Sequence, residues 1–242
     1  MKFLVVIPTY NEAENLESMI SALFSLPIGD LHILIVDDDS PDGTGEIAET
    51  IKRNFPAQLD ILHRRGKLGL GTAYIAGFKY GLDNGYELIG QMDADFSHPP
   101  EKLMELVRAV ENGADLALGS RYIPGGSLDK DWPLWRRYLS GFGNYYSRTI
   151  LDLPIRDVTG GFRVWKRSML ESMPLDQIRS NGYVFQVEMI YVAMKLGCKA
   201  VEIPFYFADR KFGTSKMSFR IQAEAAINVW RLLGMHKGIK SI

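Results

Sequence analysis

Residues 86–100 read Tyr86-Glu87-Leu88-Ile89-Gly90-Gln91-Met92-Asp93-Ala94-Asp95-Phe96-Ser97-His98-Pro99-Pro100. The first part, 86–90, is apolar and typical of a buried strand, whereas proline is common in the first turn of a helix. The segment therefore predicts a strand that leads directly into a helix opening at Pro99, with Ser97 or His98 as its cap. A strand followed by a helix is the repeating unit of an α/β sheet.

Two acidic residues, Asp93 and Asp95, stand at the end of this predicted strand. In an extended backbone, side chains two residues apart point in the same direction. Two carboxylates held together repel each other unless a cation lies between them. Hard oxygen donors suit Mg²⁺ or Mn²⁺, ions that keep positions open for substrate phosphates. The pair predicts a divalent-cation site, and an acidic turn without metal is the alternative.

The strand-to-helix pattern recurs through the first half of the chain. Further strands are predicted at 3–7, 31–36, 59–62 and 115–119, and helices at about 11–23, 40–54, 69–82 and 99–111. We expect Asn11 with Glu14 to cap the first helix and Ser40-Pro41 to start the second. This alternation indicates an α/β fold, a mostly parallel sheet with helices on both faces.

Polar residues follow four of the predicted strands, at 8–12, 37–39, 93–95 and 119–121. Ligands of such sheets bind at the carboxyl ends of the strands. We therefore expect these four segments to gather on one rim, although they are far apart in the sequence.

The pattern changes after Tyr122. A strand is predicted at 162–165, a helix at 183–196, a strand at 200–204 and a last helix at about 217–233, with a basic loop at 208–216 before it. The predicted helix at 132–151 mixes aromatic and basic residues, which suits a membrane interface, and a core-packed helix with snorkelling arginines is the alternative.

Composition limits the classes of function. The chain has 242 residues, enough for one large α/β domain, and 28 basic against 29 acidic residues give a net charge of −1. Net charge therefore does not favour nucleic acid as a partner. The single cysteine, Cys198, excludes an internal disulfide and suits a small core position. No stretch approaches the roughly 20 apolar residues of a membrane span, so we expect a cytoplasmic protein.

The usual nucleotide-binding motifs are absent from the sequence. There is no G-x-x-x-x-G-K-[ST] loop, which disfavours a P-loop NTPase. Pro-Thr-Tyr-Asn-Glu follows the first strand in place of G-x-G-x-x-G, which disfavours a dinucleotide dehydrogenase. A sugar-phosphate nucleotidylyltransferase would carry a glycine-rich, arginine-containing loop at the same place.

Four motifs together resemble the family 2 inverting glycosyltransferases. They are Val6-Ile7-Pro8-Thr9-Tyr10-Asn11-Glu12, the segment 36–44, Met92-Asp93-Ala94-Asp95 and Gly119-Ser120-Arg121-Tyr122. Segments 96–101, 157–162 and 210–216 resemble most the dolichyl-phosphate (polyprenyl-phosphate) mannose synthases. The resemblance implies a single GT-A-type nucleotide-sugar-binding domain over 1–242. Its nucleotide-sugar half would cover about 1–122, and its acceptor half, with membrane-surface helices, about 123–242.

The resemblance also implies substrates and roles. The donor would be GDP-mannose, the acceptor a polyprenyl (dolichyl) phosphate, and the products GDP and polyprenyl-phosphate β-mannose. The nucleotide-sugar ligands would be Pro8, Tyr10, Glu12, Val36, Asp38, Asp93, Ala94, Asp95, Arg121, Arg210 and Lys216. The acceptor phosphate would contact Arg121, Arg136, Arg210 and Lys216.

Catalysis would rest on Asp93, Asp95 and Arg121, and Mg²⁺ or Mn²⁺ on Asp93, Asp95 and Ser97, where many relatives have Gln in place of Ser97. A phosphate acceptor is ionised near pH 7 and needs no strong base. The nearest alternative is another nucleotide sugar, such as UDP-glucose, or another acceptor. A hydroxyl acceptor would need a base, and Glu188 or Asp157 is the candidate. A non-catalytic binding subunit is the third class, and Asp93, Asp95 and Arg121 argue against it.

A polyprenyl tail stays in the bilayer, so the resemblance implies peripheral attachment to the cytoplasmic face of a membrane, alone or with small membrane-anchoring subunits. Aromatic rings and long basic side chains favour the headgroup region. The predicted contact residues are Trp132, Trp135, Arg136, Arg137, Tyr138, Tyr145 and Tyr146. The last helix, with Trp230, is the second candidate, although a stripe at helical spacing more often packs on the core.

Overall fold

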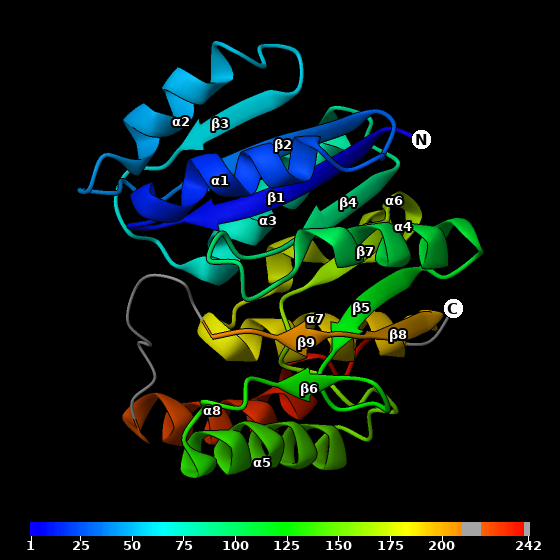
Figure 1. The fold of residues 1–242 in the computed structure, drawn as a ribbon. Helices are drawn as coiled ribbons and strands as arrows, with labels where there is room; N and C mark the ends of the chain where they lie inside the picture. The colour runs from blue at the N-terminus through cyan, green and yellow to red at the C-terminus, as the bar shows by residue number, and fades with distance from the viewer. Residues whose placement is uncertain (210–218, 240–242) are drawn as a thin grey trace.

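A computed structural model of the chain describes residues 1–209 and 219–239, with the backbone alone for 219–225. Its main sheet has seven strands in the order β3-β2-β1-β4-β7-β5-β8 (Figure 1). In chain order these are β1 (Phe3–Thr9), β2 (Leu31–Asp37), β3 (Leu59–His63), β4 (Leu88–Gln91), β5 (Leu116–Ser120), β7 (Arg163–Lys166) and β8 (Ala200–Pro204). Two short strands, β6 (Ser127–Leu128) and β9 (Tyr206–Phe207), form a separate pair.

The helices alternate with the strands as the sequence predicts. They are α1 (Ala13–Phe24), α2 (Thr44–Lys52), α3 (Leu70–Asp83), α4 (Leu103–Glu111), α5 (Leu134–Ile150), α6 (Arg167–Ser172), α7 (Gly182–Lys195) and α8 (Phe219–Met235), with 3₁₀ turns at Pro100–Lys102 and Leu175–Gln177. The prediction of a mostly parallel sheet is confirmed, because only β7 runs antiparallel to its neighbours β4 and β5 in the main sheet of the described chain. Strands from both sides of residue 122 share this sheet.

Strand β1 shows why helices cover both faces. Its side chains alternate between two core clusters, as those of a strand buried on both faces must. Phe3, Val5 and Ile7 pack with residues of α1, α2 and α4. Leu4 and Val6 pack on the opposite face with residues of α3 and α7. The wholly apolar sequence 3–7 is therefore the consequence of a central position in the sheet.

A close contact between α3 and β1 depends on Gly77. A Cβ atom at this position would lie 2.3 Å from Cγ1 of Val6, whose side chain is fully buried. Because β1 lies inside the sheet between β2 and β4, Val6 cannot move away without disturbing its neighbours.

We expect Gly77→Ala to lower the free energy of unfolding by about 1–3 kcal/mol, the usual cost of overpacking a core. The matched control is Gly143→Ala in α5, where no heavy atom lies within 4 Å of the added carbon. That control should gain up to about 1 kcal/mol from helix propensity. Urea unfolding of both variants tests the contrast, and equal effects would contradict it.

The predicted starts of two helices are wrong. Asn11 is not a helix cap, because its φ is 61° and α1 begins after Glu12 with no side-chain cap. Helix α2 begins at Thr44 rather than at Ser40. Asp42 Oδ1 accepts hydrogen bonds from the backbone N and the hydroxyl of Thr44, so the residues before Thr44 form a turn.

The aspartate pair does not lie on an extended strand. Strand β4 ends at Gln91, and residues 94–98 form a bend in which Phe96 has a φ of 61°. The predicted helix cap by Ser97 or His98 is also wrong, because the helical turn that opens at Pro100 has no side-chain cap. Both side chains point instead to the aspartates.

Helices α5 and α8 lie side by side at the edge of the molecule farthest from β3 (Figure 1). Within the described residues, no helix is both long and apolar enough to span a membrane. Cys198 is buried, as predicted for a small core residue. Burial, together with the nearby Asp115 carboxylate, raises the pKa of its thiol to about 12.

Candidate active site at the carboxyl ends of the strands

Both aspartates after β4 are held by their neighbours. Asp93 Oδ1 accepts a hydrogen bond from the Tyr74 hydroxyl at 3.2 Å, and its backbone N donates to His98 Nδ1 at 3.0 Å. Asp95 Oδ1 accepts from the backbone N of Ser97 at 3.0 Å and from its hydroxyl at 2.6 Å. The bend thus orients two carboxylates at the carboxyl end of a central strand.

The two partners of Asp93 keep fixed protonation states. Tyr74 is fully buried, and burial with the nearby Asp93 carboxylate raises its pKa well above the ordinary value, so its hydroxyl remains a donor. Burial lowers the pKa of His98 although Asp93 and Asp95 act in the opposite direction, so its imidazole stays neutral and accepts at Nδ1. His98 also stacks on Phe162, with ring centroids 5.1 Å apart.

The donors present fit a hard divalent cation. Asp95 is only 4% exposed, and a buried carboxylate requires a compensating charge or hydrogen bonds. The described residues contain no cluster of three or more His, Cys, Asp or Glu side chains arranged for a metal. Two carboxylates with open positions are the donor set that Mg²⁺ uses when substrate phosphates complete its shell.

Arg121 follows β5 and is locked to Asp157. Its Nε and Nη2 donate to the two oxygens of this carboxylate, each at 2.7 Å, and Nη2 also donates to the Thr159 hydroxyl. Burial opposes the charge of Arg121, but the Asp157 carboxylate raises its pKa above the ordinary value. The guanidinium is therefore a permanent cation with one defined orientation.

Arg136 lies on the same aromatic cluster as Arg121. The Arg136 guanidinium lies 3.6 Å from the centre of the Trp132 ring, and that ring contacts Phe207. The Arg121 guanidinium lies 5.2 Å from the Phe207 ring, which His98 also contacts. The structure thus gathers the arginines and the aspartate bend around one group of rings. The other two predicted phosphate ligands, Arg210 and Lys216, lie outside the described residues.

The predicted nucleoside residues differ in their surroundings. Asp38 is buried, forms a 2.7 Å ion pair with Arg64 and accepts from the backbone N of Gly69. Tyr10 lies under the Lys67 ammonium at 3.9 Å. Pro8 and Glu12 are half-buried at the end of β1, whereas Val36 and Ala94 are buried in the core. Lys67 and Arg64, which the sequence analysis did not single out, cover this part of the rim.

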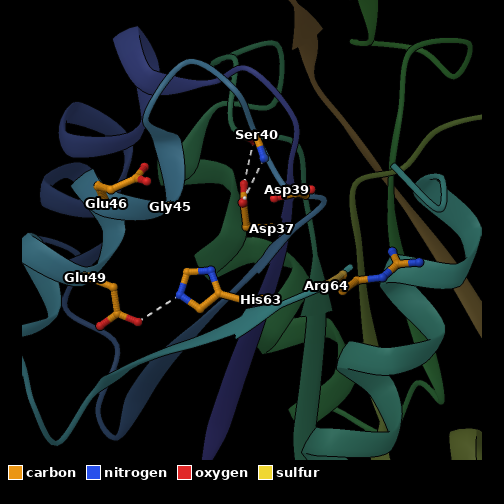
Figure 2. Close-up of a pocket in the computed structure, with 8 residues that line it drawn as sticks. All are labelled: Asp37, Asp39, Ser40, Gly45, Glu46, Glu49, His63 and Arg64. Carbon is orange, nitrogen blue, oxygen red and sulfur yellow. Dashed lines mark hydrogen bonds and ion pairs between the residues drawn. The ribbon is translucent and has the colours of Figure 1, made fainter. Parts of the chain in front are cut away.

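A small cleft of about 150 Å³ lies between β2, α2 and the end of β3 (Figure 2). It is lined by Asp37, Asp39, Ser40, Gly45, Glu46, Glu49, His63 and Arg64. Most of its charged residues are acidic, and His63 pairs with Glu49 at 2.9 Å. This lining suits the uncharged part of a nucleotide better than its phosphates.

Both candidate bases are engaged in the protein. Glu188 has no exposed surface, pairs with His236 at 2.8 Å and accepts from the backbone N of Ser180. Asp157 also has no exposed surface and holds Arg121. These contacts do not favour either carboxylate as a base for a hydroxyl acceptor, because a base must reach the proton that it abstracts.

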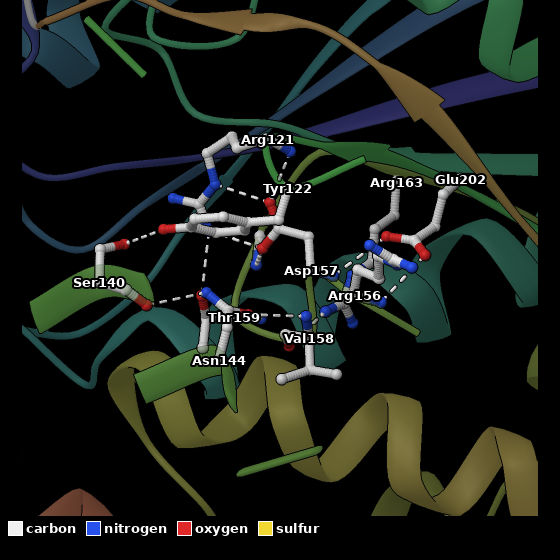
Figure 3. A network of polar contacts seen from close by, with 11 residues as sticks. Arg121, Tyr122, Ser140, Asn144, Arg156, Asp157, Val158, Thr159, Arg163 and Glu202 are labelled. Atoms are coloured by element: carbon white, nitrogen blue, oxygen red, sulfur yellow. Dashed lines mark hydrogen bonds and ion pairs between the residues drawn. The ribbon is translucent and has the colours of Figure 1, made fainter. Parts of the chain in front are cut away.

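The sequence analysis missed residues that support the site. Five consecutive backbone N–H groups, 156–160, donate to side chains of Glu202, Asn144 and Asp157 (Figure 3). Arg163 is fully buried below this turn, donates to the Val158 carbonyl, and burial lowers its pKa to about 9. No motif marks Asn144 or Glu202, since each is a single polar residue within a predicted helix or strand.

The fold is similar to that of solved glycosyltransferase structures. Glucosyl-3-phosphoglycerate synthase from Mycobacterium tuberculosis, solved with Mn²⁺, UDP and phosphoglyceric acid, superposes with a TM-score of 0.68 at 17% identity, over 99% of this chain and 80% of that one. A mannosyltransferase from Pyrobaculum calidifontis, solved with GDP-Man and Mn²⁺, gives 0.62 at 17% identity, over 98% and 65%. The sheet order and the strand-end site thus define a glycosyltransferase fold of the GT-A type.

Sequence comparison gives the family. Residues 4–173 match the glycosyl transferase family 2 domain. The polyprenol monophosphomannose synthase of Mycolicibacterium smegmatis is 45% identical, over 96% of this chain and 87% of that protein. The undecaprenyl-phosphate mannosyltransferase of Micrococcus luteus is 44% identical, over 100% and 98%. The chain belongs to glycosyl transferase family 2.

Proposed function

We propose that this protein transfers mannose from GDP-mannose to a polyprenyl phosphate with inversion, giving polyprenyl-phosphate β-mannose and GDP. The names of the relatives at 44–45% identity support the acceptor and the sugar. The structural observation that carries the proposal is that the two candidate bases, Glu188 and Asp157, are buried and paired with other side chains. An ionised phosphate can attack carbon 1 of the sugar without a base, whereas a hydroxyl cannot.

The proposed site residues form two groups, one that would hold the metal ion and one that would bind the acceptor phosphate. Asp93 and Asp95 would hold Mg²⁺ or Mn²⁺, which supplies positive charge against the β-phosphate of the leaving group. Arg121 and Arg136 would orient the acceptor phosphate, whose oxygen bonds to carbon 1 as the bond to GDP breaks. Arginine suits this role because its planar donors match phosphate oxygens. Most of the rate would come from positioning and electrostatics.

A transfer assay tests the proposal directly. Wild-type protein with radiolabelled GDP-mannose, Mn²⁺ and a polyprenyl phosphate in vesicles should give a lipid-extractable β-mannosyl product. The same lipid as a free alcohol should give none, and EDTA should stop the reaction. Parallel reactions with UDP-glucose distinguish the donor. Transfer to the alcohol, or only from another nucleotide sugar, would contradict the proposal.

The outer side of α5 carries the exposed aromatic surface expected at a membrane. Trp135, Tyr138 and Tyr145 are 62–77% exposed, and Leu134 and Phe142, which the sequence analysis did not name, are also exposed. Trp132 is wrong as a predicted membrane contact, because it is buried at 6% exposure. Tyr146 is only half-buried, and its hydroxyl donates to the Ala226 carbonyl of α8. On α8, Ile227 and Trp230 are exposed, whereas Val229 and Leu232 pack on the core.

These exposed side chains of α5 and α8 support peripheral attachment, at the cytoplasmic face in our proposal. We expect Trp135→Ala combined with Arg137→Ala to weaken binding to anionic vesicles at least about fivefold, because one basic residue near such a surface contributes about 1 kcal/mol. Wild-type binding should fall with added salt.

Vesicle sedimentation measures the effect, and Leu68→Ala is the matched control, since Leu68 is 55% exposed on the loop before α3. If the control weakens binding as much as the α5 variant, this surface is not the contact.

A further inference from the structure

Asn144 connects the inner side of α5 to the turn that holds Arg121. It is 3% exposed and makes four hydrogen bonds. Its Oδ1 accepts from the backbone N of Val158 and Thr159, and its Nδ2 donates to the Ser140 carbonyl and the Thr159 hydroxyl. A neutral side chain with all its hydrogen-bonding capacity used inside the protein is buried without an unsatisfied polar atom.

The turn to which Asn144 is hydrogen-bonded fixes the orientation of the Arg121 guanidinium. The Asp157 carboxylate accepts hydrogen bonds from Nε and Nη2 of this guanidinium, and the Thr159 hydroxyl accepts a third, also from Nη2. The same Thr159 hydroxyl accepts from Asn144, so one oxygen joins the two side chains (Figure 3). Glu202 of β8 holds the backbone N of residues 156 and 157 from the other side.

We infer that Asn144 is a positioning residue for Arg121 and that, through it, helix α5 sets the affinity for the acceptor phosphate. The inference rests on the proposed function. Its chemical basis is that a charge-assisted hydrogen bond to a phosphate depends on geometry. Because Nε and Nη2 are held by Asp157 and Thr159, a small rotation of this turn moves the rest of the guanidinium out of alignment with a phosphate. Because α5 also carries the exposed aromatic side chains, the helix that faces the proposed membrane surface is the one that orients this arginine.

Asn144→Ala tests the inference in the full-length protein. The KM for polyprenyl phosphate should rise at least fivefold, whereas the KM for GDP-mannose and the Kd for GDP with Mn²⁺ should stay within twofold. A rise in KM separates positioning from partial unfolding, because a loss of folded enzyme lowers kcat and leaves KM unchanged. Ser147→Ala is the matched control, since Ser147 is buried on the same helix and, among the described residues, its side chain makes no hydrogen bond to the turn.

A double-mutant cycle with Arg121→Ala decides whether Asn144 acts through this arginine. In the Arg121→Ala background, Asn144→Ala should change the KM for the lipid phosphate less than twofold. If Asn144→Ala fails to fold, Asn144→Asp takes its place, because an aspartate still accepts from both backbone N–H groups but cannot donate to Thr159. The same increase and the same loss of effect in the Arg121→Ala background are expected.

An unchanged KM for the lipid phosphate in the folded variant, or a full additive effect in the Arg121→Ala background, would overturn the inference alone. Absence of mannose transfer by the wild-type protein would overturn the proposed function and the inference together. Equal changes in the KM for donor and acceptor would show a general disturbance of the site and would also overturn the inference.

Discussion

Asp95→Ala should abolish Mn²⁺-dependent binding of GDP and reduce mannose transfer by on the order of 10²–10³-fold or more, the size of effect seen when an electrostatic group at a reacting centre is removed. The carboxylate is 4% exposed and oriented by two hydrogen bonds from Ser97. Its loss removes one of the two hard oxygen donors after β4. Calorimetric titration of GDP with and without Mn²⁺ measures the first effect.

The control for this variant is Asp95→Asn, which keeps the shape and the hydrogen-bond acceptor but removes the charge. It should lose GDP binding as the alanine variant does and retain the melting temperature of the wild type. Ser97→Ala tests the third proposed ligand separately. GDP binding of unchanged strength and metal dependence in Asp95→Ala would show that the cation, if required, is held elsewhere.

Arg121→Ala should affect both transfer and stability. Each charge-assisted hydrogen bond to a phosphate is worth about 1.5–3 kcal/mol, so transfer should fall roughly 10- to 100-fold or more. The folded protein should lose about 3–5 kcal/mol of stability as well, because Asp157 then remains as an unpaired charge without exposed surface. Transfer kinetics and urea unfolding measure the two losses.

The double variant Arg121→Ala with Asp157→Asn separates these effects. Removing the buried negative charge should restore part of the lost stability, since an amide side chain can be buried at a lower cost than an unpaired carboxylate. Transfer should remain as slow as in Arg121→Ala, because the phosphate contact is still missing. Recovery of transfer together with stability would show that Arg121 has a structural role alone.

Local sequence was sufficient for the elements of the first half. The run at 3–7, and that at 31–36 apart from His32, predict central strands because only a strand buried on both faces needs apolar side chains at successive positions. The spacing of Asp93 and Asp95 at the end of such a run indicated the metal candidates. Helix starts were less predictable, because the turn before α2 depends on Asp42, whose side-chain contacts compete with a helix start at Ser40.

Tertiary structure alone decided how the site residues pair. The sequence indicated Arg121 and Asp157 as separate candidates, and the fold joins them in one buried ion pair. The fold likewise pairs Glu188 with His236, which lies 48 positions away in the sequence. Such pairings depend on which strands become neighbours, and β7 enters the sheet between β4 and β5 in the reverse direction.

The sequence by itself determined the α/β fold, the family and the strand ends where polar residues gather, because periodicity and short motifs are local properties of the chain. It did not determine which carboxylates remain available for chemistry, nor that the inner side of α5 holds Arg121 through Asn144 while its outer side is exposed. Those features depend on contacts between segments distant in the sequence, and burial and pairing are defined only once these segments have packed together.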